Sequence, residues 1–426
     1  MDFSFIHVSD IHLGRPFSGL SKYSFDEKLN ELYKNAVERA FKNIVNFALI
    51  KNVDFVFIAG DTFDSDEQDF SSKLVLKEAL KKLADADIDV FLICGNHDPV
   101  SSYSKNTFSY DSNSKIKIIG LNTPRYQDFD LYNKSGNKVA CLHALSFTDD
   151  KMLENPLDYF SPPSNENIFN IGLLHCDLNA DSTSPYAPCN ITDLKNLKYD
   201  YWALGHIHIP TSAEFNIQYA GTSQGRNTKE TGVHGIRYVQ VENNRIVKNT
   251  FVSTDIIRFE DMSLDVSSLN DATEIPNVLD EELNNLINKD VNSCELFLVR
   301  LNLKGCVKFF HDINDELENI IVERIKINFN GKIYISQITN ETIPFIDETI
   351  LNEDDGIAGE LYKTAINQEI IKEKYFELKT KYKNFIDSCN FLPQDYKYFY
   401  ETIVQKAKDE CINLCSSIYD IDSKED

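Results

Sequence analysis

The sequence has no run of 18 uncharged apolar residues, so no helix is expected to span a membrane. Residues Met1–Phe5 have neither a basic stretch nor an apolar segment typical of a signal peptide, and they resemble the start of a strand. None of the nine cysteines forms a Cys-x-x-Cys pair. These absences predict a cytoplasmic protein with reduced cysteines and no membrane contact.

Positive charge is also scarce. The 426 residues include 43 Lys and Arg against 67 Asp and Glu, which gives a formal net charge of −24. A protein that grips DNA over its whole surface needs clustered basic residues. If nucleic acid is bound, the contact is therefore local and assisted by metal ions, or a partner subunit supplies most of the affinity. An acidic surface that only maintains solubility is a third interpretation.

Strands and helices are expected to alternate in the first part of the chain. Apolar runs predict strands at Phe3–Ser9, Asp54–Ala59 and Asp89–Cys94. Between them, helical spacing predicts a helix from the capping box at Ser24–Glu27 to about Lys51, and a second at Ser71–Ala86. This order predicts a parallel α/β arrangement. Further strands are expected near residues 116–119, 138–142, 168–175, 201–204, 217–220 and 235–242.

The character of the sequence changes after about residue 255. Strand-like runs at Glu295–Leu303 and Lys332–Gln337 flank a helical stretch near Ile313–Val322, which predicts a small α+β part over residues 256–350. The polar stretch before them is expected to hold loops and a helix. Residues 351–426 begin with an acidic hinge and continue as helices. We therefore predict three domains, at residues 1–255, 256–350 and 351–426.

Short polar clusters follow several of the predicted strands. They are Asp10-Ile11-His12, Gly60-Asp61-Thr62-Phe63-Asp64, Gly95-Asn96-His97-Asp98, His175 and Gly205-His206-Ile207-His208. Because the carboxyl ends of parallel strands share one edge of a sheet, these side chains are expected to converge. Carboxylate, imidazole and amide ligands suit Mn, Fe or Zn. A dinuclear centre needs a shared anionic ligand, for which Asp61 is the natural candidate, and the glycines before Asp61, Asn96 and His206 are expected to allow tight turns.

These clusters, in this order, resemble the calcineurin-like metallophosphoesterase superfamily, whose pattern is DxH, GDxxD, GNH[DE], H and GHxH. Within it, Ser9–Gly14 and Gly205–His208 are similar to the SbcD/Mre-eleven-type DNA repair exonucleases. Tyr219–Arg226 is similar to the YhaO-like bacterial branch. The resemblance implies a β-sandwich flanked by helices for the nuclease domain, a capping domain, and a helical C-terminal region as a candidate dock for an ATPase.

The resemblance also assigns roles to individual residues. One divalent cation would be held by Asp10, His12, Asp61 and His208. The other would be held by Asp61, Asn96, His175 and His206. His97 would be the catalytic imidazole that protonates the leaving oxygen, and Asp98 would orient it. Mn²⁺ is the expected cation, with Fe, Zn and Mg as alternatives, and the implied reaction is attack on phosphorus by a water that bridges two cations.

Other residues have weaker assignments. Arg15 and Arg226 are candidate substrate contacts, with solvated surface charge as the alternative. His7 lies within a strand and is expected to be a buried, hydrogen-bonded histidine. Asp64 stands where eukaryotic and archaeal relatives usually carry His, so the resemblance transfers no role to it.

The resemblance implies a DNA exonuclease, with endonuclease activity as an extension, in a DNA repair complex. Its partners would be DNA, an SbcC/YhaN-like SMC-type ATPase and a second copy of the chain in a homodimer. Lys372–Lys383 would either dock that ATPase or pack on its own protein. Two alternatives remain: a phosphodiesterase or phosphatase acting on a small nucleotide, and a non-catalytic scaffold for an ATPase.

Overall fold

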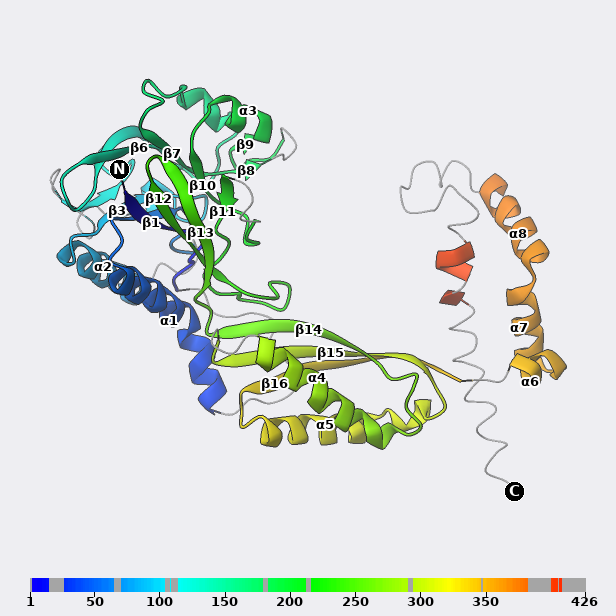
Figure 1. Cartoon of the computed structure of the whole chain (residues 1–426). Helices are drawn as coiled ribbons and strands as arrows, with labels where there is room; N and C mark the ends of the chain where they lie inside the picture. The colour runs from blue at the N-terminus through cyan, green and yellow to red at the C-terminus, as the bar shows by residue number, and fades with distance from the viewer. Residues whose placement is uncertain are drawn as a thin grey trace. The chain divides into compact units, whose positions relative to one another are not determined.

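The computed structural model describes residues 2–14, 27–64, 70–103, 108, 114–178, 183–211, 216–289, 294–345, 348–381, 400–404 and 406–407. They divide into two compact units (Figure 1). The first unit is Met1–Glu260 with Asp290–Val299 and Gly331–Ser336. The second is Asp261–Lys289, Arg300–Asn330 and Gln337–Asp426. Within the described ranges, no helix is long and apolar enough to cross a membrane.

A six-stranded sheet forms one layer of the first unit. In spatial order its strands are β13 (Arg245–Ser253), β12 (Gly235–Glu242), β1 (Phe3–Val8), β2 (Phe55–Ala59), β3 (Asp89–Ile93) and β4 (Ile116–Ile118). β1 to β4 are parallel, whereas β12 is antiparallel to both of its neighbours. The parallel part is the arrangement expected from the alternation of strands and helices in the sequence.

A five-stranded sheet forms the facing layer. In spatial order its strands are β11 (Ile217–Tyr219), β10 (Tyr201–Gly205), β7 (Phe169–His175), β6 (Lys138–Leu145) and β5 (Tyr126–Tyr132). The first four are parallel and β5 is antiparallel to β6. A separate short pair consists of β8 (Asp177–Leu178) and β9 (Pro188–Cys189).

Strand alternation explains how the sheets pack. On β2, Phe55, Phe57 and Ala59 face the second sheet, while Val56 and Ile58 face the helices. The ring of Phe5 lies 5.2 Å from that of Tyr201 across the interface. Burial of one such side chain stabilises the fold by about 2 kcal/mol. Apolar side chains therefore pack against both faces of the six-stranded sheet.

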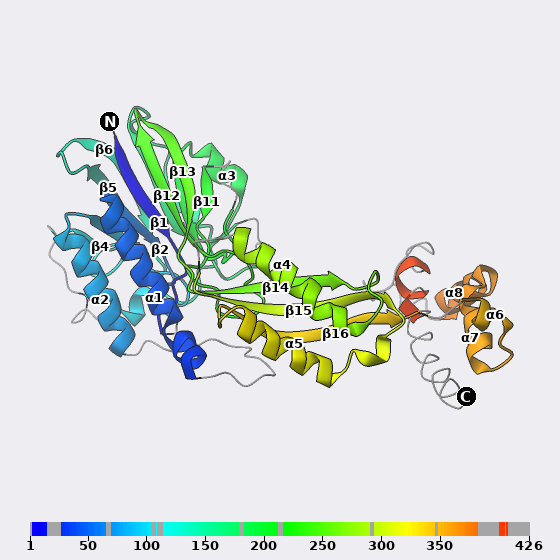
Figure 2. The same cartoon turned by 60° about the horizontal axis from the view of Figure 1, so that its bottom comes forward.

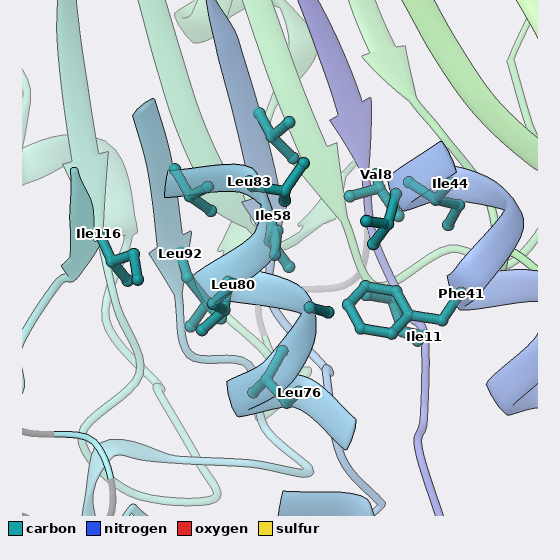
Figure 3. Packing of buried hydrophobic residues seen from close by; sticks show 14 of the residues in the cluster. Val8, Ile11, Phe41, Ile44, Ile58, Leu76, Leu80, Leu83, Leu92 and Ile116 are labelled. Carbon is teal, nitrogen blue, oxygen red and sulfur yellow. The ribbon is translucent and has the colours of Figure 1, made fainter. Parts of the chain in front are cut away.

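Helices cover the outer faces of both sheets. Figure 2 shows α1 (Glu27–Lys51) and α2 (Phe70–Asp85) beside the six-stranded sheet. Figure 3 shows Phe41 of α1 and Leu80 of α2 packed near Val8 and Ile58. α3 (Ile191–Asn196) and the buried Trp202 belong to the layer outside the other sheet. The predicted α/β sandwich flanked by helices is confirmed, although β5 and β13 were not expected from the sequence.

The second unit holds most of a three-stranded sheet with two helices. The strands are β14 (Ile257–Asp265), β15 (Leu296–Val307) and β16 (Ile333–Pro344), and the helices are α4 (Ile275–Lys289) and α5 (Asp315–Asn328). β14 extends to Asp265, although the polar stretch that it enters was expected to hold only loops and a helix. Short 3-10 helices lie at Val100–Ser102, Pro156–Tyr159, Ala272–Glu274 and Phe310–Asp312.

The C-terminal region is helical as far as the structure describes it. It contains α6 (Glu348–Glu353), α7 (Ile357–Ile366), α8 (Gln368–Lys381) and a single π-helical turn, Tyr400–Val404. The sequence Phe391-Leu392-Pro393 predicts a break in this helical region, and it lies outside the described residues. The proposed boundaries near residues 255 and 350 stay predictions.

Candidate metal centre

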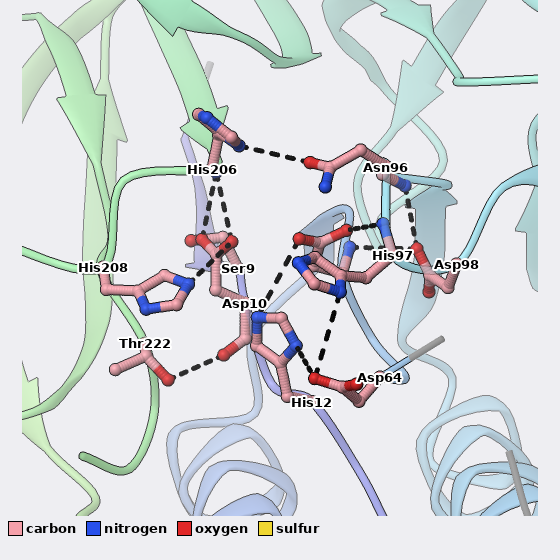
Figure 4. A network of polar contacts seen from close by, with 12 residues as sticks. Ser9, Asp10, His12, Asp64, Asn96, His97, Asp98, His206, His208 and Thr222 are labelled. Carbon is pink, nitrogen blue, oxygen red and sulfur yellow. Dashed lines mark hydrogen bonds and ion pairs between the residues drawn. The ribbon is translucent and has the colours of Figure 1, made fainter. Parts of the chain in front are cut away.

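The polar clusters lie at the carboxyl ends of strands from both sheets, as Figure 4 shows for most of them. Asp10 and His12 follow β1, Asp61 follows β2 and Asn96 follows β3 in the six-stranded sheet. The remaining predicted ligands come from the facing sheet: His175 ends β7, and His206 and His208 follow β10. The sequence predicted convergence at one sheet edge. The structure instead brings together the ends of two facing sheets.

Asp61 occupies the centre of this cluster. Its Oδ2 atom is 3.8 Å from Nε2 of His12 and 3.5 Å from Nε2 of His175. These imidazoles belong to different predicted ligand sets. One carboxylate oxygen therefore faces both candidate cation positions, which is the arrangement that a bridging ligand requires.

The predicted ligand atoms form two groups. In the first group, the ligand atoms of Asp10, His12 and His208 lie within 4.8 Å of one another. In the second, Asp10, Asp61 and His175 meet the same criterion. The Oδ1 atom of Asn96 completes the second group, 3.0 Å from Nε2 of His175 and 3.2 Å from Nδ1 of His206. All seven predicted ligands thus come together.

The backbone is strained at these ligands. Left-handed φ values, uncommon for residues other than glycine, occur at four of them: Asp10 (50°), His12 (52°), Asp61 (50°) and His206 (107°). Backbone hydrogen bonds hold this conformation, from Asp10 N to Gly60 O at 3.1 Å and from His12 N to Asp61 O at 3.0 Å. Such strain is typical of functional sites.

The glycines before the ligands act in two different ways. Gly60 has a φ of +85°, so the prediction of a tight turn holds there. At Gly95 and Gly205 the reason is close packing instead. A Cβ at Gly95 would lie 2.2 Å from Oδ1 of Asp61, and one at Gly205 would lie 1.9 Å from the carbonyl oxygen of Ala59.

Asp98 ties two ligand loops together. Its buried carboxylate accepts hydrogen bonds from the backbone N–H groups of Asp61, Thr62, Phe63 and Gly95 and from the hydroxyl of Tyr103. The N–H of His97 in turn donates to Oδ1 of Asp61 at 2.9 Å. The contacts of Asp98 therefore fix the backbone on which His97 is carried.

The charges of the site are those expected around cations. Burial, together with the charges of Asp10 and Asp98, raises the pKa of Asp61 well above its usual value. Burial lowers the pKa of His12 to about 3 and that of His206 to about 4. The neutral imidazole that results is the form that binds metals. Both ring nitrogens of His12 are buried without a hydrogen-bond partner, so the residues fit a pair of divalent cations.

His97 lies on the accessible side of the cluster. Its side chain is 36% exposed, and its Nδ1 atom is 3.9 Å from Oδ2 of Asp64. Its ring packs edge-on against that of His12, with 5.0 Å between centroids. Within the site, His97 is therefore placed where a bound substrate could reach it.

The two predicted substrate contacts have different outcomes. Arg15 lies outside the described residues. The side chain of Arg226 is 4% exposed, and its Nη2 atom is 3.0 Å from Nδ1 of His208. Its role as a substrate contact stays a prediction.

Sequence reasoning missed the roles of two carboxylates, Asp64 and Glu230. Asp64 Oδ2 is 3.4 Å from Nδ1 of His12, and Glu230 Oε1 is 2.8 Å from Nδ1 of His208. The signal for Asp64 was its place at the end of the GDxxD block. For Glu230 it was the Arg-x-x-x-Glu spacing in the loop after the last ligands.

Comparison with known proteins agrees with this geometry. Residues 3–210 match the sequence model of the calcineurin-like phosphoesterases. The chain is 29% identical over 308 residues to the "Uncharacterized metallophosphoesterase YhaO" of Bacillus subtilis, covering 71% of this chain and 72% of that protein. It is also similar to proteins named "DNA double-strand break repair protein Mre11".

Identity to the Methanocaldococcus jannaschii Mre11 protein is 24% over 228 residues, covering 52% of this chain and 56% of that one. For Thermoplasma acidophilum it is 23% over 340 residues, covering 77% and 84%. The chain spans about half the length of several archaeal relatives it matches. The family match covers all seven ligands, so residues 3–210 form a calcineurin-like metallophosphoesterase domain with a candidate dinuclear metal site.

Proposed function

We propose that this chain is a DNA exonuclease that hydrolyses phosphodiester bonds with two divalent cations, Mn²⁺ in the first instance. The observation that supports the two-cation chemistry of this proposal is the position of Asp61 Oδ2, which faces His12 at 3.8 Å and His175 at 3.5 Å. The first cation position comprises Asp10, His12, Asp61 and His208. The second comprises Asp61, Asn96, His175 and His206.

The protein's own residues have separate tasks in this reaction. When bound, two cations acidify a water and polarise the phosphoryl oxygens. Asp98 keeps the loops of Asp61 and Asn96 in register through its backbone hydrogen bonds. His97, on the accessible side, donates a proton to the leaving oxygen.

DNA as the substrate is supported by the archaeal relatives, which are named as DNA double-strand break repair proteins. The net charge of −24 makes a partner that adds DNA affinity a natural part of the proposal. We propose an SbcC/YhaN-like SMC-type ATPase in that role, a homodimer as the working form, and the cytoplasm as the location. Endonuclease activity is an extension of the same chemistry.

A small-nucleotide phosphodiesterase or phosphatase is the second candidate. The YhaO relative is named only as a metallophosphoesterase, and the same ligands would serve either substrate. A non-catalytic scaffold is a third candidate. The partly exposed His97 weighs against it, because a purely structural metal site has no need of an imidazole beside the substrate space.

The test gives the purified chain, loaded with Mn²⁺, four substrates: labelled linear duplex DNA, labelled single-stranded DNA, bis-p-nitrophenyl phosphate and cyclic nucleotides. Each assay is repeated with the partner ATPase and with His97→Ala. The exposed His311, outside the site, provides the matched control His311→Ala. We expect end-dependent DNA degradation that falls about 100-fold or more in His97→Ala and is unchanged in the control.

The possible results separate the three candidates. Hydrolysis of nucleotides or the chromogenic diester without any DNA degradation would replace the exonuclease by the small-nucleotide enzyme. Absence of all hydrolysis, with every cation and with the ATPase, would leave the non-catalytic scaffold as the remaining candidate. Full DNA degradation by His97→Ala would remove His97 from the chemistry while keeping the nuclease.

A further inference from the structure

Three buried charged residues, Asp64, Arg226 and Glu230, lie next to two imidazoles of the metal centre and are called the charge chain below. Arg226 is at its middle, with Nη2 3.2 Å from Oε1 of Glu230 and Nη1 3.9 Å from Oδ2 of Asp64. The three side chains are between 4% and 13% exposed. Ion pairs this well removed from water are costly to build. Their presence beside the site therefore calls for a function.

Each of the two carboxylates in the charge chain faces the Nδ1 atom of one imidazole. Oε1 of Glu230 is 2.8 Å from Nδ1 of His208, and Oδ2 of Asp64 is 3.4 Å from Nδ1 of His12. Figure 4 shows the contact between Asp64 and His12. A carboxylate can only accept, so the hydrogen bond to Glu230 draws the proton of the His208 ring to Nδ1. Asp64 makes no hydrogen bond to His12, but its negative charge favours a proton on Nδ1 of that ring as well.

The opposite nitrogen of each ring faces the cluster. Nε2 of His208 is 3.9 Å from Oδ1 of Asp10, and Nε2 of His12 is 3.8 Å from Oδ2 of Asp61. A proton on Nδ1 leaves the lone pair on Nε2, where a cation would bind. A carboxylate behind a ligating imidazole fixes both its tautomer and its orientation.

Arg226 holds Glu230 by hydrogen bonds and attracts Asp64 by charge alone, because Nη1 has no hydrogen-bond partner. Nη2 is also 3.0 Å from Nδ1 of His208, but guanidinium nitrogens can only donate. Nδ1 cannot both donate to Glu230 and accept from Arg226, and the shorter contact is with the carboxylate. The backbone N–H of Arg226 donates to Oε2 of Glu230 at 2.8 Å, so the glutamate is held at both oxygens.

We propose that Asp64, Arg226 and Glu230 are positioning residues that set the cation affinity of the first metal position alone. This inference rests on the proposed dinuclear centre. The imidazoles of the second position have other supports. His175 places Nδ1 2.9 Å from the carbonyl oxygen of Ala59, whereas Nδ1 of His206 lies 3.2 Å from Oδ1 of its fellow ligand Asn96. Loss of the charge chain is therefore expected to leave one cation bound rather than none.

The experiment counts Mn²⁺ ions on the full-length chain by calorimetric titration and by electron paramagnetic resonance of free Mn²⁺. It compares wild type, Glu230→Gln, Arg226→Ala, Arg226→Lys and Asn96→Ala. The exposed Glu242, near the end of β12, gives the control Glu242→Gln. Urea unfolding without metal checks that each variant folds.

We expect two Mn²⁺ ions on wild type and on the control. In Glu230→Gln and Arg226→Ala, one of the two affinities should fall about 10- to 100-fold, the usual effect of removing a group behind a ligand. Arg226→Lys should recover part of the lost Mn²⁺ affinity. Asn96→Ala should weaken the other ion, and the double variant Glu230→Gln/Asn96→Ala should weaken both.

Three results would overturn the inference. They are unchanged affinities in Glu230→Gln, equal weakening of both ions, and an Arg226→Ala variant that keeps both ions while the KM for DNA rises, which would make Arg226 a substrate contact. Failure of the proposed dinuclear centre looks different, because wild type itself would then bind fewer than two ions.

Discussion

Oδ2 of Asp61 lies 3.5 Å from Nε2 of His175, although Asp61 follows β2 of one sheet and His175 ends β7 of the other. The candidate metal centre is therefore built across the interface of the sandwich. Each sheet supplies ligands that the other lacks.

Asp61→Asn should separate metal binding from folding. Losing the shared ligand is expected to lower Mn²⁺ affinity and phosphodiesterase activity at least about 100-fold. Without metal, however, the variant should be at least as stable as wild type, because it removes a carboxyl group whose ionisation is opposed by burial and by the charges of Asp10 and Asp98. Urea unfolding with and without Mn²⁺ measures both effects, with the exposed Asp158→Asn as control. A variant less stable than wild type in EDTA would contradict this account.

Asp98→Ala should destabilise the fold rather than only the reaction. It leaves four backbone N–H groups and the hydroxyl of Tyr103 without their acceptor. We expect a loss of at least about 3 kcal/mol in the free energy of unfolding without metal. Tyr103→Phe removes one of these bonds and should cost about 1–2 kcal/mol. Equal losses in the two variants would show that the backbone contacts of Asp98 contribute little.

His7 should make stability depend on acid pH. It is fully buried, as expected from the sequence, with Nδ1 3.0 Å from the Tyr201 hydroxyl and Nε2 3.0 Å from the Leu204 carbonyl oxygen. Burial lowers its pKa from 6.5 to about 3, assisted by Arg237. Between these values the unfolded chain binds a proton that the folded chain does not.

The contribution of His7 to stability is therefore complete above pH 6.5 and is lost as the pH falls toward 3. The slope should be about 1 kcal/mol per pH unit. His7→Gln should show a smaller slope in urea unfolding between pH 4 and 6, while the control His311→Gln keeps the wild-type slope. Parallel curves for wild type and His7→Gln would rule out this role.

Phe376→Asp tests α8 as the dock for the proposed ATPase. Phe376 is 52% exposed and Ile370 is 40% exposed, whereas Tyr375 between them is buried. An aspartate at position 376 should weaken co-purification of the ATPase about 10-fold or more, with hydrolysis of bis-p-nitrophenyl phosphate unchanged. Glu373→Ala on the same helix is the control. If Phe376→Asp co-purifies with the ATPase as well as wild type does, the ATPase does not dock on this surface.

Much of the site could be predicted because its residues directly follow strands with strong apolar patterns. Phe55–Ala59 is buried throughout, so the end of β2 and the place of Asp61 were clear from the sequence. β5 and β13 were missed for the opposite reason. They are edge strands, and only Leu131 among their residues is buried, so no apolar pattern marks them.

Other features depend on contacts between distant residues. The Arg-x-x-x-Glu spacing relates Glu230 to Arg226, but it does not indicate that Glu230 lies against the ring of His208, 22 residues earlier. The division of the ligands between two sheets was equally hidden, because each strand and its cluster look the same whichever sheet contains them. Strand periodicity gives the face of a side chain but not the partner strand.

The position of the ligands across the sheet interface gives the cations a further consequence. Metal bound by Asp61 and His175 would cross-link the two sheets much as a disulfide links two segments. Removing it with a chelator should first loosen the contact between the sheets while each keeps its internal hydrogen bonds. Hydrogen exchange would then speed up at the carboxyl ends of β2 and β7 before it does at their centres.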